Sequence, residues 1–527
     1  MVGCYAQTEM GHGSDVQNLE TLAVFDPKTD EFIMQSPTIT SAKMWPGDLG
    51  IFANYAMVFA QLIIKGTNHG VQAFLVPIRD METHTPLPGV EVGDIGPKLG
   101  FQTKDNGFLR LNNVRIPREN MLMKYAKVTK DGEFKIVGND KALYGIMMFV
   151  RLIIAGYSHR FLGHGLTVAL RYSIVRTQFK NENKKEIKIL DYQLQQEKLF
   201  PVLADHISMT FTSIRLRELV ADNFKRIQDN DFSLLNETHV VLSGTKALFT
   251  YQILFGMEKC RLACGGHGFS HYSSLPAIQQ EVAANCTLEG ENTVMFLQVA
   301  RYLLKMYNKA SKGQKVNHLV DYMSNCSTFL QERCEAKSPQ DFRSTEVLRK
   351  LLMNNALYWI NATGMMVMEG LGAGLSMKDI WDKKIGLPLV DAARAHTQYY
   401  VFNCFSEGVR KVRDENLRTT LTRLCVLHGL QTILDRPSGV IESEYINPEQ
   451  IKFMNQLRET LFSEIRPDAI GLADATRFSD NTLRSALGRY DGKVYETMYE
   501  WASTKNSFQD APGMEHIFQL KNINPKL

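Results

Sequence analysis

The stretch RLACGGHGFSHYSSLPAIQQEVAANCTLEGENTVMFLQV, from Arg261 to Val299, carries the strongest signal in this chain. It begins with a glycine-rich segment, Cys264 to Phe269, which we expect to be a loop whose backbone N–H groups can approach a phosphate or a flat ring closely. About twenty residues later, a carboxylate stands at a tight turn, Leu288 to Asn292, and an apolar helical run follows at once. A carboxylate beside such a segment, at the start of a helix, can act as a general base.

The turn offers two carboxylates for that role, Glu289 and Glu291. Each also fits a simpler interpretation, because a negative charge is favourable at the positive end of a helix dipole. The spacing alone does not decide between the two glutamates, nor between catalysis and helix capping.

The composition indicates an ordinary soluble protein of more than one domain. A chain of 527 residues is longer than one hydrophobic core normally supports, so we expect two or three domains. The formal net charge of +4 is too small to indicate nucleic-acid binding. The longest apolar run, Tyr144 to Gly156, is interrupted by Arg151 and is too short to cross a bilayer. No signal peptide is visible, and we expect no membrane span.

Eight cysteines are scattered along the chain, and their spacing does not predict a metal site. The only close pair, Cys260 and Cys264, has no second pair or histidine at zinc-binding spacing. A reduced compartment fits this usage best. The last three residues, Pro525 to Leu527, share their Lys-Leu end with the peroxisomal signal S-K-L, although a chance tail would look the same.

Residues 1–130 are predicted to form a β-barrel or sandwich domain. Two short apolar runs flank the turn Asp26 to Asp30 and predict a hairpin. Further β-rich runs, Tyr55 to Ile64, Gln72 to Ile78 and Gly107 to Ile116, are separated by turn residues. Several short strands with regular breaks are typical of a barrel or sandwich.

The remainder is predicted to be helical, which gives an α+β multidomain fold class. Apolar residues at helical spacing, such as Leu162 and Leu166, begin a helical domain over residues 131–330. A polar stretch containing a proline, residues 331–345, resembles a linker, and a second helical domain over residues 331–527 would follow. The charged run Lys180 to Lys188 is predicted to be a solvated loop.

The glycine segment and the Glu-Gly-Glu-Asn-Thr-Val turn together resemble the acyl-CoA oxidase branch of the acyl-CoA dehydrogenase family. Two further motifs point to the same branch: Trp45-Pro46-Gly47, where dehydrogenases carry W-I-T-N, and the phrase Leu487 to Glu496, for which dehydrogenases are too short. The resemblance implies FAD-dependent desaturation of a fatty acyl-CoA to the trans-2-enoyl-CoA. It also implies that dioxygen reoxidises the flavin to give hydrogen peroxide. A peroxisomal location follows, in which Pro525 to Leu527 would be a variant signal.

The same resemblance assigns roles to individual residues. Glu289, the glutamate directly before the glycine, would remove the α-proton of the substrate. The implied FAD contacts are Tyr5, Ala6, Gln7, Thr8, Gly13, Ser14, Trp45, Gly47, Arg176, Gln196, Gly265, Gly266, Gly268 and Glu291. The implied acyl-CoA contacts are Ser14, Lys141, Ala142, Leu143, Tyr144 and Arg151.

The resemblance also implies a dimer, because in this family the arginine corresponding to Arg176 reaches the FAD pyrophosphate across a subunit interface. The partner would be a second copy or a related acyl-CoA oxidase. Family members normally carry a helical domain before the β-domain. Here the first β-domain motif begins at Tyr5, so we expect that domain to be missing, which would leave apolar surface without cover. Two alternatives remain: an acyl-CoA dehydrogenase that uses an electron-transfer flavoprotein, and a non-catalytic subunit that pairs with a complete relative.

Overall fold

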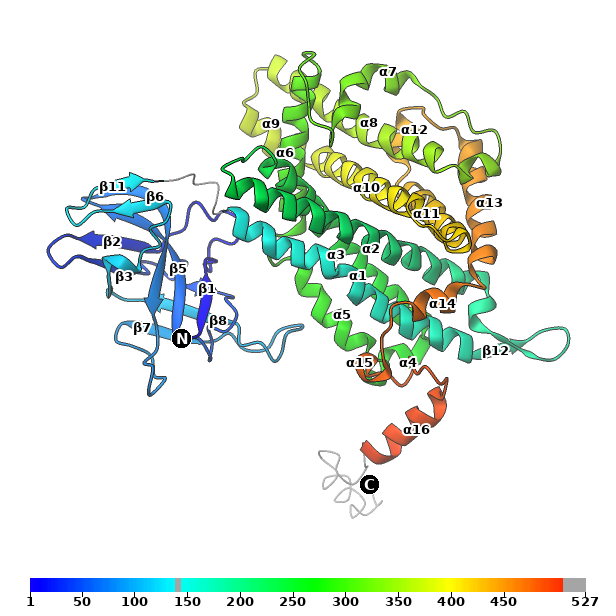
Figure 1. Ribbon diagram of the computed structural model, residues 1–527, viewed down its shortest axis with the longest axis horizontal. Helices are drawn as coiled ribbons and strands as arrows, with labels where there is room; N and C mark the ends of the chain where they lie inside the picture. The colour runs from blue at the N-terminus through cyan, green and yellow to red at the C-terminus, as the bar shows by residue number, and fades with distance from the viewer. Residues whose placement is uncertain (138–143, 506–527) are drawn as a thin grey trace, which may run out of the picture. The chain divides into compact units, whose positions relative to one another are not determined.

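The computed structural model describes residues 1–137 and 144–505 and divides the chain into two compact units (Figure 1). The first unit combines Met1–Phe149 with the short segment Thr287–Val294, and the second combines Val150–Cys286 with Met295–Leu527. The predicted substrate contacts Lys141, Ala142 and Leu143 lie outside the described residues, as does the C-terminal tripeptide.

The first unit is built from short strands in two main sheets. A six-stranded sheet has the order β1-β5-β2-β3-β9, with β6 also paired to β5, and a three-stranded sheet has the order β4-β8-β7. Strands β10 and β11 form a separate pair. The bounds are β1 (Gly3–Ala6), β2 (Leu22–Asp26), β3 (Glu31–Gln35), β4 (Lys43–Met44), β5 (Tyr55–Ile64), β6 (Thr67–Pro77), β7 (Val90–Asp94), β8 (Gly107–Leu111), β9 (Val114–Pro117), β10 (Ala126–Val128) and β11 (Phe134–Ile136).

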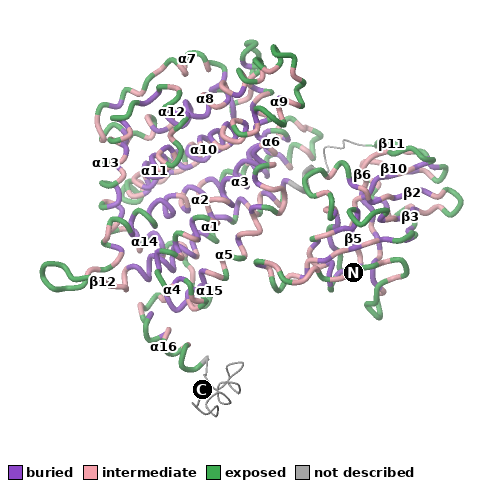
Figure 2. The backbone as a smooth tube through the Cα atoms, turned by 180° about the vertical axis from the view of Figure 1, so that it is seen from behind, coloured by how far each residue is buried: buried purple, intermediate pink, exposed green. Residues whose placement is uncertain are grey.

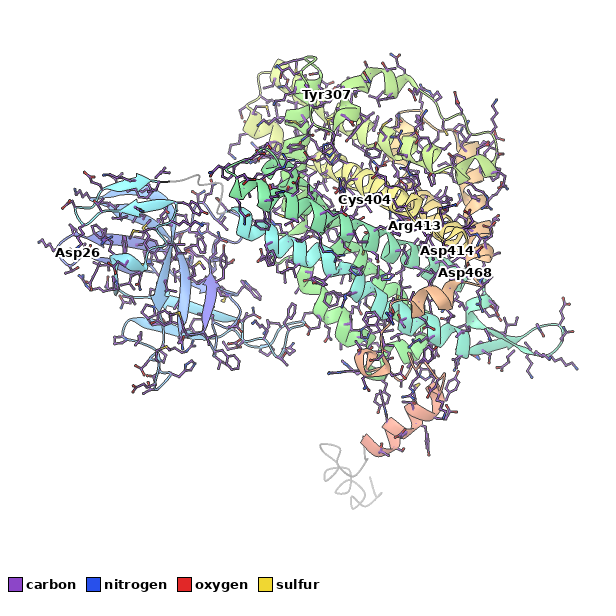
Figure 3. The ribbon with its side chains drawn as sticks, viewed as in Figure 1. Asp26, Tyr307, Cys404, Arg413, Asp414 and Asp468 are labelled. Carbon is purple, nitrogen blue, oxygen red and sulfur yellow. The ribbon has the colours of Figure 1, made fainter. Side chains whose placement is uncertain are left out.

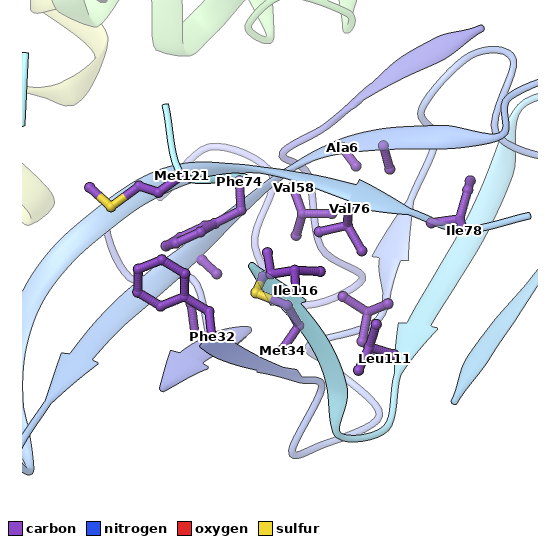
Figure 4. Packing of buried hydrophobic residues seen from close by; sticks show 14 of the residues in the cluster. Ala6, Phe32, Met34, Val58, Phe74, Val76, Ile78, Leu111, Ile116 and Met121 are labelled. Carbon is purple, nitrogen blue, oxygen red and sulfur yellow. The ribbon is translucent and has the colours of Figure 1, made fainter. Parts of the chain in front are cut away.

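The predicted hairpin is present, and it contributes to a single core between the two sheets. Strands β2 and β3 pair antiparallel from Leu22 opposite Gln35 to Asp26 opposite Glu31, so alternate side chains point inward. Phe32 and Phe74 are fully buried, with ring centroids 5.0 Å apart (Figure 4). Leu111 of the smaller sheet belongs to the same cluster. Burying each such side chain contributes roughly 1.5–3 kcal/mol.

The described remainder of the chain, 144–505, is mainly helical, and the long helices lie side by side with buried inner faces (Figure 2). Helix α10 packs against α2, α3, α8 and α11. Helix α1 is joined to α2 by a hydrogen bond of 2.8 Å from His206 Nδ1 to the His159 carbonyl. The helices are α1 (Tyr144–Val175), α2 (Gln193–Gln228), α3 (Leu235–Ala263), α4 (Gly265–Phe269), α5 (Leu275–Ala283), α6 (Asn292–Ala310), α7 (Cys326–Gln331), α8 (Thr345–Gly372), α9 (Met377–Lys383), α10 (Gly386–Arg410), α11 (Glu415–Asp435), α12 (Ser438–Glu442), α13 (Pro448–Ile465), α14 (Ala469–Asp474), α15 (Asp480–Leu483) and α16 (Val494–Lys505).

Local sequence explains where several of these helices begin. Ser344 and Asp414 accept hydrogen bonds from the third residue of α8 and α11, which satisfies amide groups that have no partner inside the helix. Asn447 and Gln450 form a reciprocal capping box at the start of α13. These caps fix the ends of helices whose inner faces are already held by packing.

The Leu487 to Glu496 phrase includes the joint between α15 and α16 and contains a turn at Gly492. Gly492 has a φ of 72°, which is a conformation that glycine adopts readily. Arg171 of α1 holds this joint, because its Nη1 donates to the Gly488 carbonyl at 2.8 Å and its Nε donates to Asp474 at 2.9 Å. Its guanidinium also lies over the Tyr490 ring. The joint is therefore a packed structural element of the helical unit.

The prediction of a solvated loop from Lys180 to Lys188 is wrong in part. Two short antiparallel strands, β12 (Thr177–Lys180) and β13 (Glu186–Lys188), form a hairpin that projects from the helices (Figure 1). The Thr177 hydroxyl donates to the Glu186 carboxylate at 2.5 Å across the pair, and only the tip is loop. The charged composition predicted solvent exposure correctly but gave no sign of this cross-strand pairing.

Among the helices that the structure describes, one, α3, is long and apolar enough by composition to cross a membrane, but 78% of its most apolar window is buried inside the unit. Burial of that kind is typical of a core helix. All eight cysteines are free thiols. Within residues 1–137 and 144–505, no cluster of three or more His, Cys, Asp or Glu side chains could hold a metal ion.

Candidate active site

The first predicted flavin segment, Gln7-Thr8, follows directly from β1 and is tied to a second, Met44-Trp45. The Met44 amide donates to the Thr8 carbonyl at 3.0 Å, and Glu9 forms an antiparallel bridge with Lys43. The Thr8 hydroxyl makes no hydrogen bond to any residue in the described part of the chain. It is therefore available to a ligand, as the prediction for Thr8 requires.

Trp45 has the features of a ligand-facing aromatic rather than of a core residue. Its side chain is 56% exposed, and its φ of 83° is rare for a bulky residue. Its amide donates to the Gly107 carbonyl at 3.0 Å, and its own carbonyl accepts from Asn106 at 2.6 Å. Backbone strain held in this way is concentrated at functional sites.

The two predicted glycines of the first unit serve different ends. At Gly47 an added Cβ would lie 2.5 Å from Cε of Lys104, a flexible side chain that would have to move aside. At Gly13 an added Cβ would meet nothing within 4 Å, and Ser14 beside it is exposed. Gly13 and Ser14 thus leave open backbone that a phosphate could approach closely.

Tyr5 and Glu289 are brought together in the first unit although 284 positions separate them in the sequence. Partial burial and the Glu289 carboxylate raise the pKa of Tyr5 to about 12. The Tyr5 hydroxyl donates to Gln7 Oε1 at 3.1 Å, and its ring packs on Phe59 with centroids 4.9 Å apart. The Glu289 carboxylate therefore lies close enough to Tyr5, beside the predicted flavin segment, for its charge to affect the Tyr5 pKa.

The structure separates the roles of the two glutamates that the sequence left equivalent. Glu291 accepts hydrogen bonds from the amides of Thr293 and Val294 at 2.9 and 3.2 Å, so its carboxylate caps α6. Glu289 has a φ of 55°, and Gly290 has a φ of 102°. The backbone at residues 289 and 290 is therefore left-handed, a conformation that is uncommon for a residue other than glycine.

Arg151 of the second unit has the partner that its position in an apolar run requires. It is 5% exposed, and its Nη1 lies 3.4 Å from Nδ1 of His239 on α3. Burial and the Arg151 charge lower the pKa of His239 to about 4, so the imidazole is neutral near pH 7 and can accept this hydrogen bond. Tyr144 is the first residue of α1.

Arg176 follows the last residue of α1, at the opposite end from Arg151. Its Nη2 donates to Gln178 Oε1 at 3.2 Å, and a hydrogen bond to Tyr495 of α16 raises its pKa further. Twenty-five residues at a rise of 1.5 Å place Arg151 and Arg176 about 37 Å apart along the helix axis. The two arginines of one chain therefore cannot contact the same small group.

The glycine segment was predicted to be a loop, and that prediction is wrong: residues Gly265 to Phe269 form the short helix α4. An added Cβ at Gly265 or Gly266 would meet nothing within 4 Å, so this backbone is open to a ligand. At Gly268 an added Cβ would lie 2.1 Å from the Arg261 carbonyl, so this glycine lets α4 fold back on the end of α3. Glycine has a low helix propensity, so the sequence did not predict this helix.

The predicted cofactor residue Gln196 is buried and donates from Nε2 to the Leu190 carbonyl at 3.0 Å. Its neighbour Gln195, which sequence analysis did not select, donates to the Ala263 carbonyl at 2.7 Å and to Ser173 Oγ at 3.0 Å. Gln195 thereby supports the chain just before the glycine segment. The sequence signal for this role was the pair of consecutive glutamines, Gln195-Gln196, which the structure places, buried, at the start of α2.

Comparisons with known proteins agree along the whole chain. The model for the acyl-CoA dehydrogenase middle domain matches residues 4–114, that for the acyl-CoA oxidase C-alpha1 domain matches residues 144–304, and that for acyl-CoA oxidase matches residues 344–520. The human peroxisomal acyl-coenzyme A oxidase 1 is 42% identical over 532 aligned positions, which cover all of this chain and 80% of the relative. The chain belongs to the acyl-CoA oxidase family.

Solved structures of acyl-CoA oxidases confirm the predicted α+β fold class. Arabidopsis thaliana acyl-CoA oxidase 1 superposes with a TM-score of 0.94 at 35% identity, over 98% of this chain and 80% of that one. A Caenorhabditis elegans acyl-CoA oxidase 2, bound with FAD, ascaroside-CoA and ATP, has a TM-score of 0.92 at 37% identity, over 99% of this chain and 78% of that one. The chain thus spans about four fifths of the length of these acyl-CoA oxidases.

A separate hollow of about 520 Å³ in this acyl-CoA oxidase chain contains none of the predicted site residues. It is lined by residues of α10, α11 and α13 near Asp414 and Asp468 (Figure 3). Arg343 and Arg423, which line it, are both paired with Glu464, at 2.6 and 3.4 Å. Two arginines of the hollow thus share one carboxylate, and a third, Arg418, pairs with Glu415.

Proposed function

We propose that this chain desaturates a fatty acyl-CoA to the trans-2-enoyl-CoA with Glu289 as the general base. The proposal rests on one observation, that the two glutamates of the 287–294 turn have different roles. Glu291 is committed to capping α6, whereas Glu289 lies near Tyr5, beside the predicted flavin segment. A carboxylate placed beside a bound substrate can act as the general base that removes its α-proton.

The residues present fit FAD. Thr8 offers an unpaired hydroxyl, Trp45 an exposed ring, and Gly13, Gly265 and Gly266 open backbone. When bound, FAD would accept the β-hydrogen with its electron pair and pass the electrons to dioxygen, giving hydrogen peroxide. The chain's own task is to orient the acyl-CoA, take the α-proton at Glu289 and provide backbone N–H donors to the thioester carbonyl.

We propose that the active form is a dimer, either of this chain or with a related acyl-CoA oxidase. The separation of Arg151 and Arg176 by about 37 Å along α1 supports this proposal, because Arg176 could then serve the cofactor of the partner subunit. We also propose a peroxisomal location, in line with the names of the relatives. The division of the helical part into domains 131–330 and 331–527 remains a proposal, supported by the separate family matches to 144–304 and 344–520.

The proposed function is tested by purifying this chain, recording its flavin absorbance and assaying peroxide under air with acyl-CoAs of several lengths. We expect a yellow protein that forms peroxide without an added electron acceptor. Turnover only with an electron-transfer flavoprotein would indicate the dehydrogenase alternative. A protein without flavin or turnover, even when FAD is supplied, would indicate the non-catalytic subunit.

Arg176→Ala should weaken FAD retention and dimerisation together. The loss of a charged hydrogen-bond donor to the pyrophosphate should raise the FAD dissociation constant about ten- to hundredfold. The measurement is FAD titration combined with sedimentation of the same sample. Arg160→Ala, on the exposed face of the same helix, is the matched control and should change neither quantity. Parent-like FAD affinity in Arg176→Ala would remove Arg176 from the cofactor site.

A further inference from the structure

Glu9 and Lys43 form a buried ion pair in the first unit, with Nζ of Lys43 3.0 Å from Oε1 of Glu9 and both side chains almost fully buried. Each charge is completely satisfied. Besides Glu9, the lysine ammonium donates to the carbonyls of Gln7 at 3.1 Å and Phe59 at 2.7 Å, which uses all its donors. Sequence analysis assigned neither residue a role.

The Glu9 carboxylate is equally engaged. Its oxygens accept from the amides of Glu20 and Thr21 at 2.8 and 2.9 Å and from the Thr21 hydroxyl at 2.5 Å. Burial alone would raise the pKa of Glu9, but the Lys43 charge and these hydrogen bonds hold it below its usual value. The imidazole of His12 lies 3.4 Å from the same carboxylate. Glu9 thus stays ionised and connects the start of β2 to the turn that precedes Gly13.

The pair joins two segments that are far apart in the sequence, 7–10 and 42–45, and each contains predicted cofactor residues. Lys43 binds the Gln7 carbonyl directly, and the adjoining backbone bonds run from Met44 to Thr8 and from Met10 to Ala42, at 3.0 and 2.8 Å. Thr8 and Trp45 both extend from this junction. A buried ion pair usually adds little net stability compared with apolar residues of the same volume. We therefore expect the pair to matter for how the neighbouring backbone is positioned rather than for stability.

We propose that Glu9 and Lys43 are positioning residues that fix the Gln7-Thr8 and Met44-Trp45 backbones for flavin binding. The proposal rests on the proposed FAD-dependent function, although its structural half can be measured without flavin. Neither side chain touches the reacting atoms. They act through the Gln7 carbonyl, which Lys43 holds, and so position the Thr8 hydroxyl and the Trp45 ring, which would face the cofactor.

The test compares Lys43→Met with the double variant Glu9→Gln/Lys43→Met. The single variant leaves the Glu9 carboxylate buried without its partner, so a general loss of stability is expected. The double variant removes that unpaired charge and should regain most of the parent Tm. In the double variant without flavin, we expect the amides of Met10, Met44 and Trp45 to exchange hydrogen about tenfold faster or more, while amides of β3 and β9 keep their parent rates.

The same double variant should bind added FAD about ten- to hundredfold more weakly than the parent chain. Phe32→Leu, a core change in the same unit, is the control for general destabilisation and should not raise exchange selectively at Met44 and Trp45. Parent exchange rates at Met10, Met44 and Trp45 in the double variant would overturn the proposal. A uniform increase in exchange rate across the unit would also overturn it. So would selectively faster exchange at these amides together with an unchanged FAD affinity. If the parent itself binds no FAD, the proposed function fails and so does the flavin-positioning role, whereas selective exchange would still identify a backbone clamp.

Discussion

Glu289→Gln should keep bound FAD and lose turnover by about 10²- to 10⁴-fold, the range that a positioned general base contributes. Glutamine has nearly the same shape as glutamate, so the left-handed turn at residues 289 and 290 should be preserved. It cannot accept the α-proton, which is only weakly acidic in a thioester. The decisive measurement is the rate of flavin bleaching when acyl-CoA is mixed with the enzyme without oxygen, followed by peroxide formation under air.

Glu291→Gln is the matched control, since it makes the same chemical change two residues away. The Glu291 carboxylate accepts from the amides of Thr293 and Val294, so its loss should cost about 0.5–2 kcal/mol at the start of α6. Turnover per bound flavin should fall far less than in Glu289→Gln. If Glu291→Gln lost turnover and Glu289→Gln kept it, Glu291 would be the base. Near-normal turnover in Glu289→Gln would remove Glu289 from the chemistry.

The contrast between these glutamates shows what the sequence could and could not decide. Helix-dipole and capping arguments apply to any carboxylate near a helix start, so they made Glu289 and Glu291 equivalent. The distinction arises from the positive φ at Glu289 and from its proximity to Tyr5, which comes from the other end of the chain. Such long-range proximity leaves no local pattern. Only the family resemblance selected Glu289.

Local chemistry, by contrast, predicted local structure well. The turn Asp26 to Asp30 between two apolar runs predicted the β2–β3 hairpin, because turn residues and two-residue periodicity act over a few positions. The β12–β13 pair was missed because it lies in a charged run of low β-propensity without apolar alternation, in which the Thr177 side chain donates a hydrogen bond to Glu186 across the pair. The Glu9–Lys43 pair joins positions 34 residues apart and was invisible for the same reason as the proximity of Tyr5 to Glu289.

Gly268→Ala should destabilise the helical unit by about 3 kcal/mol, the upper end of ordinary overpacking, because its Cβ would lie 2.1 Å from the Arg261 carbonyl. The obstacle is backbone, which cannot move aside as a flexible side chain could. Either α4 must separate from the end of α3, or the Gln195 bond to Ala263 must lengthen. Urea unfolding followed by far-ultraviolet circular dichroism should show a lower midpoint.

Gly266→Ala, in the same short helix, separates folding from cofactor binding. A Cβ there would meet nothing within 4 Å, and alanine favours helix over glycine by about 1 kcal/mol, so the urea midpoint should stay the same or rise. If FAD approaches this open backbone, the added methyl group should nevertheless weaken FAD binding several-fold in a direct titration. An unchanged FAD dissociation constant would remove Gly266 from the cofactor site. A parent-like midpoint for Gly268→Ala would show that α4 is not packed on the end of α3, because only that close contact makes glycine necessary at position 268.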